Sequence, residues 1–316
     1  MTGLVPYTIH VRGRLVDLSE PQVMGILNVT PDSFYAASRM QTEDAVRQRV
    51  RQMVEEGAQM IDIGAYSSRP GAEDVSPREE MERMTWGMKV VREEAPDMPV
   101  SVDTFRADVA KMAIEELDAD IINDISGGEL DKAMFPTVAK LGVPYVLMHN
   151  KPDPLCPSGI SPSMGRMPSG MYSIEPPSRK ALPIEGEMPE GQRGSFLMKE
   201  VLLYFAERVQ KLRDLGQKDI ILDPGYGFAK TLDHNYELLQ HQEMLNVFEL
   251  PILVGVSRKS MIYKLLDCTP QEALNGTTVL NTLALQKGAN ILRVHDVKAA
   301  VEVVRLYQKF EKLKNV

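Results

Sequence analysis

Short apolar runs alternate with longer stretches of helical periodicity along almost the whole chain. Near-continuous Val, Ile and Leu in such runs indicates strands that are buried on both faces. Strands that alternate with helices indicate a parallel sheet. The predicted strands lie at Val23–Val29, Gln59–Ala65, Pro99–Thr104, Asp120–Ser126, Pro144–His149, Asp219–Gly225, Pro251–Ser257 and Asn290–His295.

Eight strand–helix units in 316 residues predict an α/β protein with the (β/α)8 TIM-barrel fold, which usually takes about 250 residues plus insertions. An open doubly wound sheet is the rival architecture. It is disfavoured because no Gly-x-Gly-x-x-Gly follows the first strand. Residues 1–20 alternate apolar and polar positions around Arg12-Gly13, which predicts an N-terminal hairpin that plugs one end of a single-domain barrel covering residues 1–316.

One segment interrupts the alternation. Residues 151–194, after the fifth strand, hold 9 Pro, 6 Gly and 6 Ser in 44 positions, which is unusual for a loop in a compact domain. A surface insertion and a lid or docking surface are both open interpretations. The fifth helix is expected from Ser195 to Leu215-Gly216. For the second helix, Ser76, Pro77 and Glu79 predict an N-cap, a first-turn proline and a capping box.

Composition narrows the class of protein. Hydrophobic content of 43% and charged content of 25% are those of an ordinary globular chain. The net charge of -8, with no basic tract, argues against nucleic acid as the main partner. No apolar run approaches a membrane span or the core of a signal peptide. Cys156 and Cys268 are expected to be free thiols in a reducing cytoplasm.

Polar residues stand at the exit of every predicted strand. In a barrel these exits meet at the face that carries the chemistry. A single residue such as Asp103 has a structural alternative, the N-cap of the next helix, but the combination is far more specific than its parts. The set comprises Asn28, Ser67-Ser68-Arg69, Asp103, Asn123, His149, Asp223, Ser257-Arg258-Lys259, Arg293 and His295.

Two kinds of chemistry are present in this set. Arg69, Arg293 and His295, with Asn28, suit phosphate oxygens, which arginine binds in a bidentate manner. The second group consists of Asp103, Asn123, Asp223 and Lys259. Its carboxylates accept the parallel N–H donors of a flat nitrogen heterocycle, and its lysine donates to ring acceptors. The predicted ligand is a heterocycle that is joined to a phosphate or diphosphate.

Five motifs, in the same order along nearly the whole chain, resemble the signatures of the dihydropteroate synthases. They are Met24–Phe34, Ile122–Gly127, Asp223–Phe228, Ser257–Ser260 and Leu292–Val297. The resemblance implies a pterin-binding TIM barrel. The implied reaction joins 6-hydroxymethyl-7,8-dihydropterin diphosphate to p-aminobenzoate, gives 7,8-dihydropteroate and diphosphate in folate biosynthesis, and requires Mg2+.

The family's residue roles transfer to matching positions of this sequence. The resemblance implies that Asp103, Asn123, Met148, Asp223 and Lys259 bind the pterin, and that Lys259, Arg293, Asp103 and Asp223 are the catalytic residues. It assigns the diphosphate to Asn28, Ser68, Arg69, Arg293 and His295, and Mg2+ to Asn28. Phe34, Ser68, Pro70, Phe228 and Ser257 form the implied p-aminobenzoate site, where sulfonamides compete. The implied partners are these small molecules, with a homodimer as an option and no membrane contact.

The chain departs from the family pattern at a few positions. Ser68 stands where threonine is usual, Tyr-Ala-Ala-Ser follows Phe34, and Ala229 replaces a frequent glycine. Three rival functions remain: a pterin-dependent methyltransferase, a ligand-binding barrel without catalysis, and an aldolase that forms a Schiff base at Lys259. The intact diphosphate residues argue against the first two, and the aldolase requires a lysine with a lowered pKa.

Overall fold

A computed structural model describes residues 7–29, 39–66, 75–150 and 196–313. Its centre is an eight-stranded parallel sheet in the order β8-β7-β6-β5-β4-β3-β10-β9, and a bridge between Leu222 and Ile252 joins the two outer strands. The barrel prediction is confirmed and the doubly wound alternative is wrong. The strands are β3 Gln22–Asn28, β4 Met60–Gly64, β5 Val100–Asp103, β6 Ile121–Asp124, β7 Tyr145–Met148, β8 Ile220–Asp223, β9 Leu253–Val254 and β10 Ile291–Val294.

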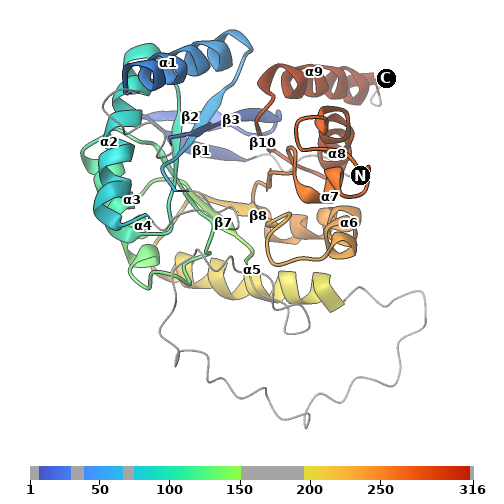
Figure 1. Ribbon diagram of the computed structural model, residues 1–316. Coiled ribbons are helices and arrows are strands. Elements are labelled where there is room, and N and C mark those ends of the chain that lie inside the picture. Colours follow the sequence, from blue (N-terminus) through green and yellow to red (C-terminus); the bar gives the residue numbers. More distant parts are fainter. Residues whose placement is uncertain (1–6, 30–38, 67–74, 151–195, 314–316) are drawn as a thin grey trace, which may run out of the picture.

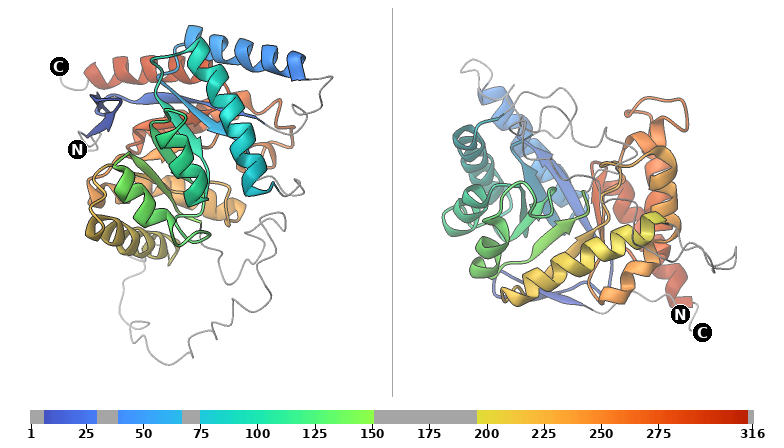
Figure 2. Two further views of the ribbon diagram at one scale, coloured as in Figure 1. Left: turned by 90° about the vertical axis from the view of Figure 1, so that its left-hand side faces the viewer. Right: turned by 90° about the horizontal axis from the view of Figure 1, so that it is seen from below.

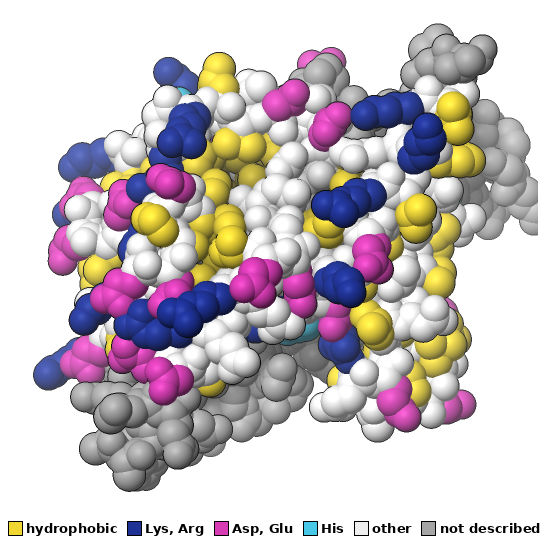
Figure 3. All heavy atoms as spheres, turned by 90° about the horizontal axis from the view of Figure 1, so that it is seen from above, with side chains coloured by type: hydrophobic (Ala, Val, Ile, Leu, Met, Phe, Trp, Pro, Cys, Tyr) yellow, Lys and Arg dark blue, Asp and Glu magenta, His cyan; other side chains and the backbone are white. Residues whose placement is uncertain are grey.

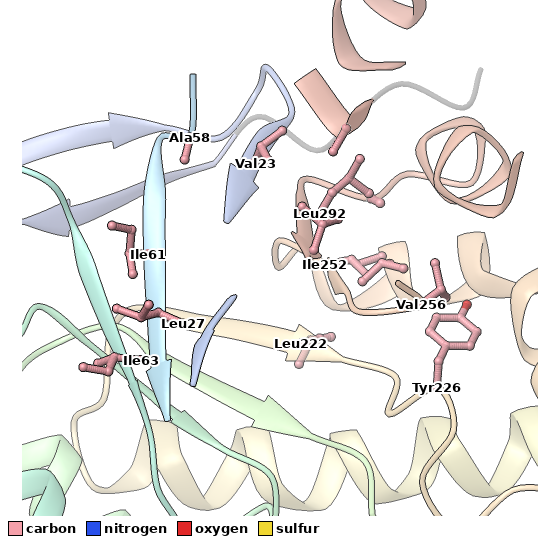
Figure 4. Packing of buried hydrophobic residues seen from close by; sticks show 14 of the residues in the cluster. Val23, Leu27, Ala58, Ile61, Ile63, Leu222, Tyr226, Ile252, Val256 and Leu292 are labelled. Carbon is pink, nitrogen blue, oxygen red and sulfur yellow. The ribbon is translucent and has the colours of Figure 1, made fainter. Parts of the chain in front are cut away.

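Helices surround the barrel and cover the outer face of its strands (Figures 1 and 2). Their apolar faces pack on outward-pointing strand residues such as Leu27, Ile63 and Leu292, which Figure 4 shows around the barrel wall. The helices are α1 Arg39–Glu55, α2 Pro77–Glu94, α3 Ala107–Glu115, α4 Met134–Leu141, α5 Phe196–Asp214, α6 Leu232–Gln240, the 3-10 helix η3 Gln242–Phe248, α7 Ser260–Tyr263, α8 Leu274–Gln286 and α9 Val297–Leu313.

The predicted helix boundaries are confirmed, but the predicted capping box is not formed. The Ser76 hydroxyl caps α2 by accepting the Glu79 backbone N–H at 3.2 Å, and Pro77 occupies the first turn. The Glu79 carboxylate pairs with Arg83 one turn later, so the observed cap differs from a reciprocal capping box. Helix α5 ends just before Gly216, whose φ of +90° suits glycine better than any other residue.

The N-terminal hairpin closes the end of the barrel at which the strands begin, as predicted. Strand β1, Thr8–Val11, pairs antiparallel with β2, Arg14–Asp17, around a turn in which Arg12 and Gly13 have positive φ. Ile9, Val11 and Leu18 are buried against one inward-facing residue from most strands of the barrel. That layer consists of Met24, Met60, Ile121, Val146, Ile221, Leu253 and Ile291.

Charged side chains of both signs lie interspersed on the face of the molecule that Figure 3 shows. Among the described residues, some charged side chains form pairs within one helix, such as Arg78 with Glu82. No helix in the described ranges is long and apolar enough to cross a membrane. Cys268 is a free, partly exposed thiol, whereas Cys156 and the predicted 151–194 insertion lie outside the described residues.

Candidate active site

A cavity of about 310 Å³ opens at the carboxyl ends of the strands. Each described residue to which the sequence assigns a ligand lines it: Asn28, Asp103, Asn123, Met148, Asp223, Phe228, Ser257, Lys259, Arg293 and His295. The lining also includes Ile26, Tyr66, Ile125, Gly255 and Arg258. The predicted residues Phe34, Ser68, Arg69 and Pro70 lie outside the described ranges.

The cavity follows from the alternation of side chains along each strand. Residues two positions apart in a strand point to the same face. Met24 of β3 contacts the hairpin, so Ile26 points into the barrel one layer higher and lines the cavity. In the same way Arg293 lies two residues beyond Ile291 of the plug layer. The hairpin thus fills the lower layer with apolar side chains, and the upper layer forms the polar cavity.

Arg293 joins two carboxylates beside this cavity. Its Nε donates to Asp62 at 2.6 Å, and its Nη2 donates to Asp103 at 2.9 Å. Burial lowers the pKa of Arg293, but the two carboxylates raise it more, so the guanidinium keeps its charge. The sequence assigned Arg293 to phosphate oxygens and Asp103 to the heterocycle. The structure places both residues in one ion-pair network.

Asp62 is a site residue that the sequence reasoning missed. Its side chain is fully buried in β4, and it also accepts hydrogen bonds from Asn123 Nδ2 at 3.2 and 3.3 Å. The alternation of side chains along a strand identifies it, because Asp62 follows the inward-facing Met60 by two positions and must point into the barrel as well. Among the described residues Asn123 Oδ1 has no hydrogen-bond partner, so the amide keeps an acceptor next to the cavity.

Asp103 and a further carboxylate, Asp223, line the cavity and have raised pKa values. Burial raises the pKa of Asp103 to about 7, although Arg293 lowers it. Burial also raises the pKa of Asp223, while Lys259 lowers it. Asp223 Oδ1 accepts the Gly225 backbone N–H at 2.8 Å, which orients its carboxylate. A cationic ligand or one with N–H donors would favour the ionised forms of both acids.

Lys259 enters the cavity from the N-terminus of α7. Its ammonium donates to the carbonyl of Tyr226 and lies 4.5 Å from the centre of the Phe228 ring. Burial lowers the pKa of Lys259 to about 8, although Asp223 raises it. The lowered pKa that an aldolase needs is therefore present, and that property alone does not discriminate against the aldolase.

The remaining strand exits have different roles. Ser257 Oγ accepts the His295 backbone N–H at 3.1 Å, which fixes two predicted ligand residues relative to each other. Arg258 forms a bidentate pair with Asp296, with both bonds at 2.8 Å, and this holds β9 and β10 together at the rim. His149 does not line the cavity as the sequence led us to expect, because its ring packs on Tyr204 of α5 with centroids 4.6 Å apart.

The comparisons with known proteins agree with this geometry. The model of the pterin binding enzyme family matches residues 24–295. The chain is 36% identical over 307 residues to the dihydropteroate synthase of Escherichia coli K12, covering 95% of each protein. It is 35% identical over 301 residues to that of Bacillus subtilis, covering 94% of this chain and 92% of the relative.

Solved structures give the same result. A Yersinia pestis dihydropteroate synthase with a sulfonamide drug superposes with a TM-score of 0.78 at 35% identity, over 97% of this chain and 100% of that one. A Xanthomonas albilineans dihydropteroate synthase with 4-aminobenzoic acid gives 0.77 at 31% identity, over 97% and 98%. The chain therefore belongs to the dihydropteroate synthase family of pterin binding enzymes.

Proposed function

We propose that this chain condenses 6-hydroxymethyl-7,8-dihydropterin diphosphate with p-aminobenzoate to give 7,8-dihydropteroate and diphosphate. The observation that carries the proposal is the cavity in which Asp103, Asn123 and Asp223 face Lys259 and Arg293. This set combines acceptors for a nitrogen heterocycle with cations for a leaving anion. The family relationship supports the same reaction.

The pterin would bind in the deeper part of the cavity. Its exocyclic amine and the neighbouring ring N–H are parallel donors, which a carboxylate such as Asp223 accepts together. Asn123 Oδ1 is an available acceptor, and Met148, with 1% of its surface exposed, would supply apolar contact to the ring face. Lys259 would donate to the ring's own acceptors.

The diphosphate would lie toward Asn28, Arg293 and His295, with Ser68 and Arg69 as further ligands from outside the described residues. Mg2+ prefers oxygen ligands and commonly uses one or two side chains together with substrate phosphates. Asn28 fits this use. A Cβ on Gly64 would lie 3.7 Å from Asn28 Oδ1 and 3.8 Å from Asp103 Oδ2, so the glycine keeps the space beside the amide oxygen open. When bound, Mg2+ would stabilise the negative charge of the departing diphosphate.

The reaction would proceed by loss of diphosphate before amine attack. Arg293 and His295 stabilise the leaving charge by preorganised electrostatics. The cation that remains delocalises into the pterin ring, where the carboxylates of Asp103 and Asp223 favour it. The aniline nitrogen of p-aminobenzoate has a free lone pair, so it attacks without a strong general base. The C–O bond breaks, the C–N bond forms, and the amine releases one proton.

p-Aminobenzoate would bind nearer the rim. Phe228 and Ser257 line the cavity there, and Phe34, Ser68 and Pro70 would complete the pocket. Sulfonamides carry the same aniline group and are expected to compete for this pocket. Inhibition that competes only with the pterin diphosphate would contradict this placement.

The test of the function is product analysis with purified protein, the pterin diphosphate, p-aminobenzoate and Mg2+. Formation of dihydropteroate is expected. Binding of the pterin without turnover would support a ligand-binding barrel instead. Methyl transfer from methyltetrahydrofolate to a corrinoid, without dihydropteroate formation, would support the methyltransferase.

We also propose a homodimer in the cytoplasm. Helices α8 and α9 lie side by side and expose apolar side chains, with Val279 50% and Leu283 41% exposed on α8. Leu285 of the same helix is buried in the core. Sedimentation of the wild-type protein and of a Val279→Asp variant tests the dimer: a wild-type monomer would contradict it.

A further inference from the structure

Lys230 is a half-buried cation that the proposed reaction does not use. Its ammonium lies behind the cavity wall, in the loop between β8 and α6, where it donates to the carbonyls of Gly225 at 2.9 Å and Phe228 at 3.2 Å. It also lies 3.1 Å from Nδ1 of His149. Burial lowers the pKa of Lys230 to about 7, although Asp223 raises it. A charge that is costly to bury is expected to have polar partners, and here two partners are carbonyls of this loop and two are atoms of His149.

The conformation of this loop explains why its carbonyl groups need lysine side chains as hydrogen-bond donors. Gly225, Gly227 and Ala229 have φ of +71°, +78° and +49°, so left-handed residues alternate with ordinary ones. The carbonyls consequently point to different sides of the loop. Lys230 binds the carbonyls of Gly225 and Phe228 from behind, and Lys259 binds that of Tyr226 from the cavity side.

The glycines keep room for both lysines. A Cβ on Gly225 would lie 3.2 Å from Lys230 Nζ and 2.1 Å from the His149 carbonyl oxygen. A Cβ on Gly227 would lie 2.9 Å from Lys259 Cδ. The contact with His149 is to backbone, so it cannot be relieved by a side-chain rotation. The loop is therefore built for close approach of lysine side chains on two sides.

The position of this loop determines the geometry of the site. Phe228 lines the cavity, and its ring lies under the Lys259 ammonium. We propose that Lys230 is a positioning residue for the reaction, because it holds the loop that places Phe228 against the incoming p-aminobenzoate and Lys259 against the pterin. This inference rests on the proposed function. Lys230 itself does not line the cavity.

The test compares the variants Lys230→Met and Lys230→Gln with the wild-type enzyme. Methionine keeps the volume and removes the donor, whereas glutamine keeps a shorter N–H donor. Lys211→Met is the matched control, since Lys211 pairs with Glu207 on the exposed side of α5. For each protein we would measure the folded fraction, kcat, KM for both substrates, and pterin affinity by calorimetry.

We expect folded Lys230→Met to lose about tenfold or more in kcat, the effect of a lost charge-assisted hydrogen bond. Its KM for p-aminobenzoate should rise, and its pterin affinity should fall by a smaller factor, because Asp103, Asn123 and Met148 lie on other strands and only Lys259 contacts the loop. The kcat of Lys230→Gln should lie between those of Lys230→Met and wild type. If Lys230→Met does not fold, Lys230→Gln is the variant compared with wild type. The control should match wild type.

A purely structural role would lower only the folded fraction and leave KM and kcat per folded enzyme unchanged. That result, with an active wild-type enzyme, would overturn the role of Lys230 and leave the proposed function standing. Absence of dihydropteroate formation by the wild-type enzyme would overturn both.

Discussion

The Nε of Arg293 donates a hydrogen bond to the buried carboxylate of Asp62 at 2.6 Å. The pair links β10 to β4 across the intervening β3. Asp62 has no exposed side-chain surface and Arg293 has only 17%. The pair is therefore the internal support of the cavity, and it holds the guanidinium that the proposed mechanism places against the leaving group.

Asp62→Asn is expected to destabilise the protein by up to about 3 kcal/mol, because it removes one of the two carboxylates that pair with the buried Arg293 guanidinium and leaves only Asp103. Activity should fall as well, since Arg293 loses its orientation. Urea unfolding and steady-state kinetics measure the two effects. Glu207→Gln is the control, because it removes an exposed pair with Lys211 that contributes less than about 1 kcal/mol. If Asp62→Asn and Glu207→Gln lost the same stability and activity, the pair of Asp62 with Arg293 would contribute no more than an exposed pair.

Lys259→Ala is expected to weaken substrate binding by about ten- to a hundredfold, since one charge-assisted hydrogen bond is lost. The fold should remain intact because Lys259 lines the cavity and does not belong to the apolar core. Lys264→Ala, an exposed lysine next to the same short helix, serves as the control. Near-normal turnover of a folded Lys259→Ala enzyme would contradict the assignment.

Asp103 should make stability depend on pH. Burial raises its pKa to about 7 in the folded protein, from about 3.9 in an unfolded chain. Between these values the folded state binds the proton more tightly, so this group's contribution to the free energy of unfolding falls as pH rises. Asp103→Asn removes the effect. We therefore expect the variant to gain stability relative to wild type between pH 5 and 7, measured by urea unfolding. If the difference in free energy of unfolding between variant and wild type stayed constant over this pH range, Asp103 would ionise normally.

The two substrates should bind in order. The residues assigned to p-aminobenzoate and to diphosphate share the segments after the first two barrel strands, because Phe34 follows Asn28 and Pro70 follows Arg69. Ligands that share segments are expected to be energetically coupled. We expect calorimetry to detect weak or no p-aminobenzoate binding to the free enzyme. Binding should become measurable once pterin, diphosphate and Mg2+ are present, and tight binding to the free protein would disprove the order.

The fold was largely predictable because strand periodicity and buried apolar runs determine it locally. Each predicted strand contains the observed one to within a residue, and Ser76 and Gly216 delimit their helices as expected. The hairpin plug was also predictable from alternation around Arg12-Gly13. These features depend on neighbouring residues, so they are visible in a single sequence.

The contacts among site residues were less predictable. Asp62 was overlooked because it lies inside an apolar run and its role comes from Arg293, which is 231 residues away. His149 was expected at the cavity, but its side chain contacts α5 instead. The sequence predicts that a residue lies at the end of a strand. It does not predict which neighbour the side chain binds.

The central claim is tested most directly by measuring diphosphate and dihydropteroate together in one reaction. The wild-type protein is first supplied with the pterin diphosphate and Mg2+, and p-aminobenzoate is added afterwards. The protein should then form the two products in equal amounts. Diphosphate released without dihydropteroate, or no release with both substrates present, would contradict the account.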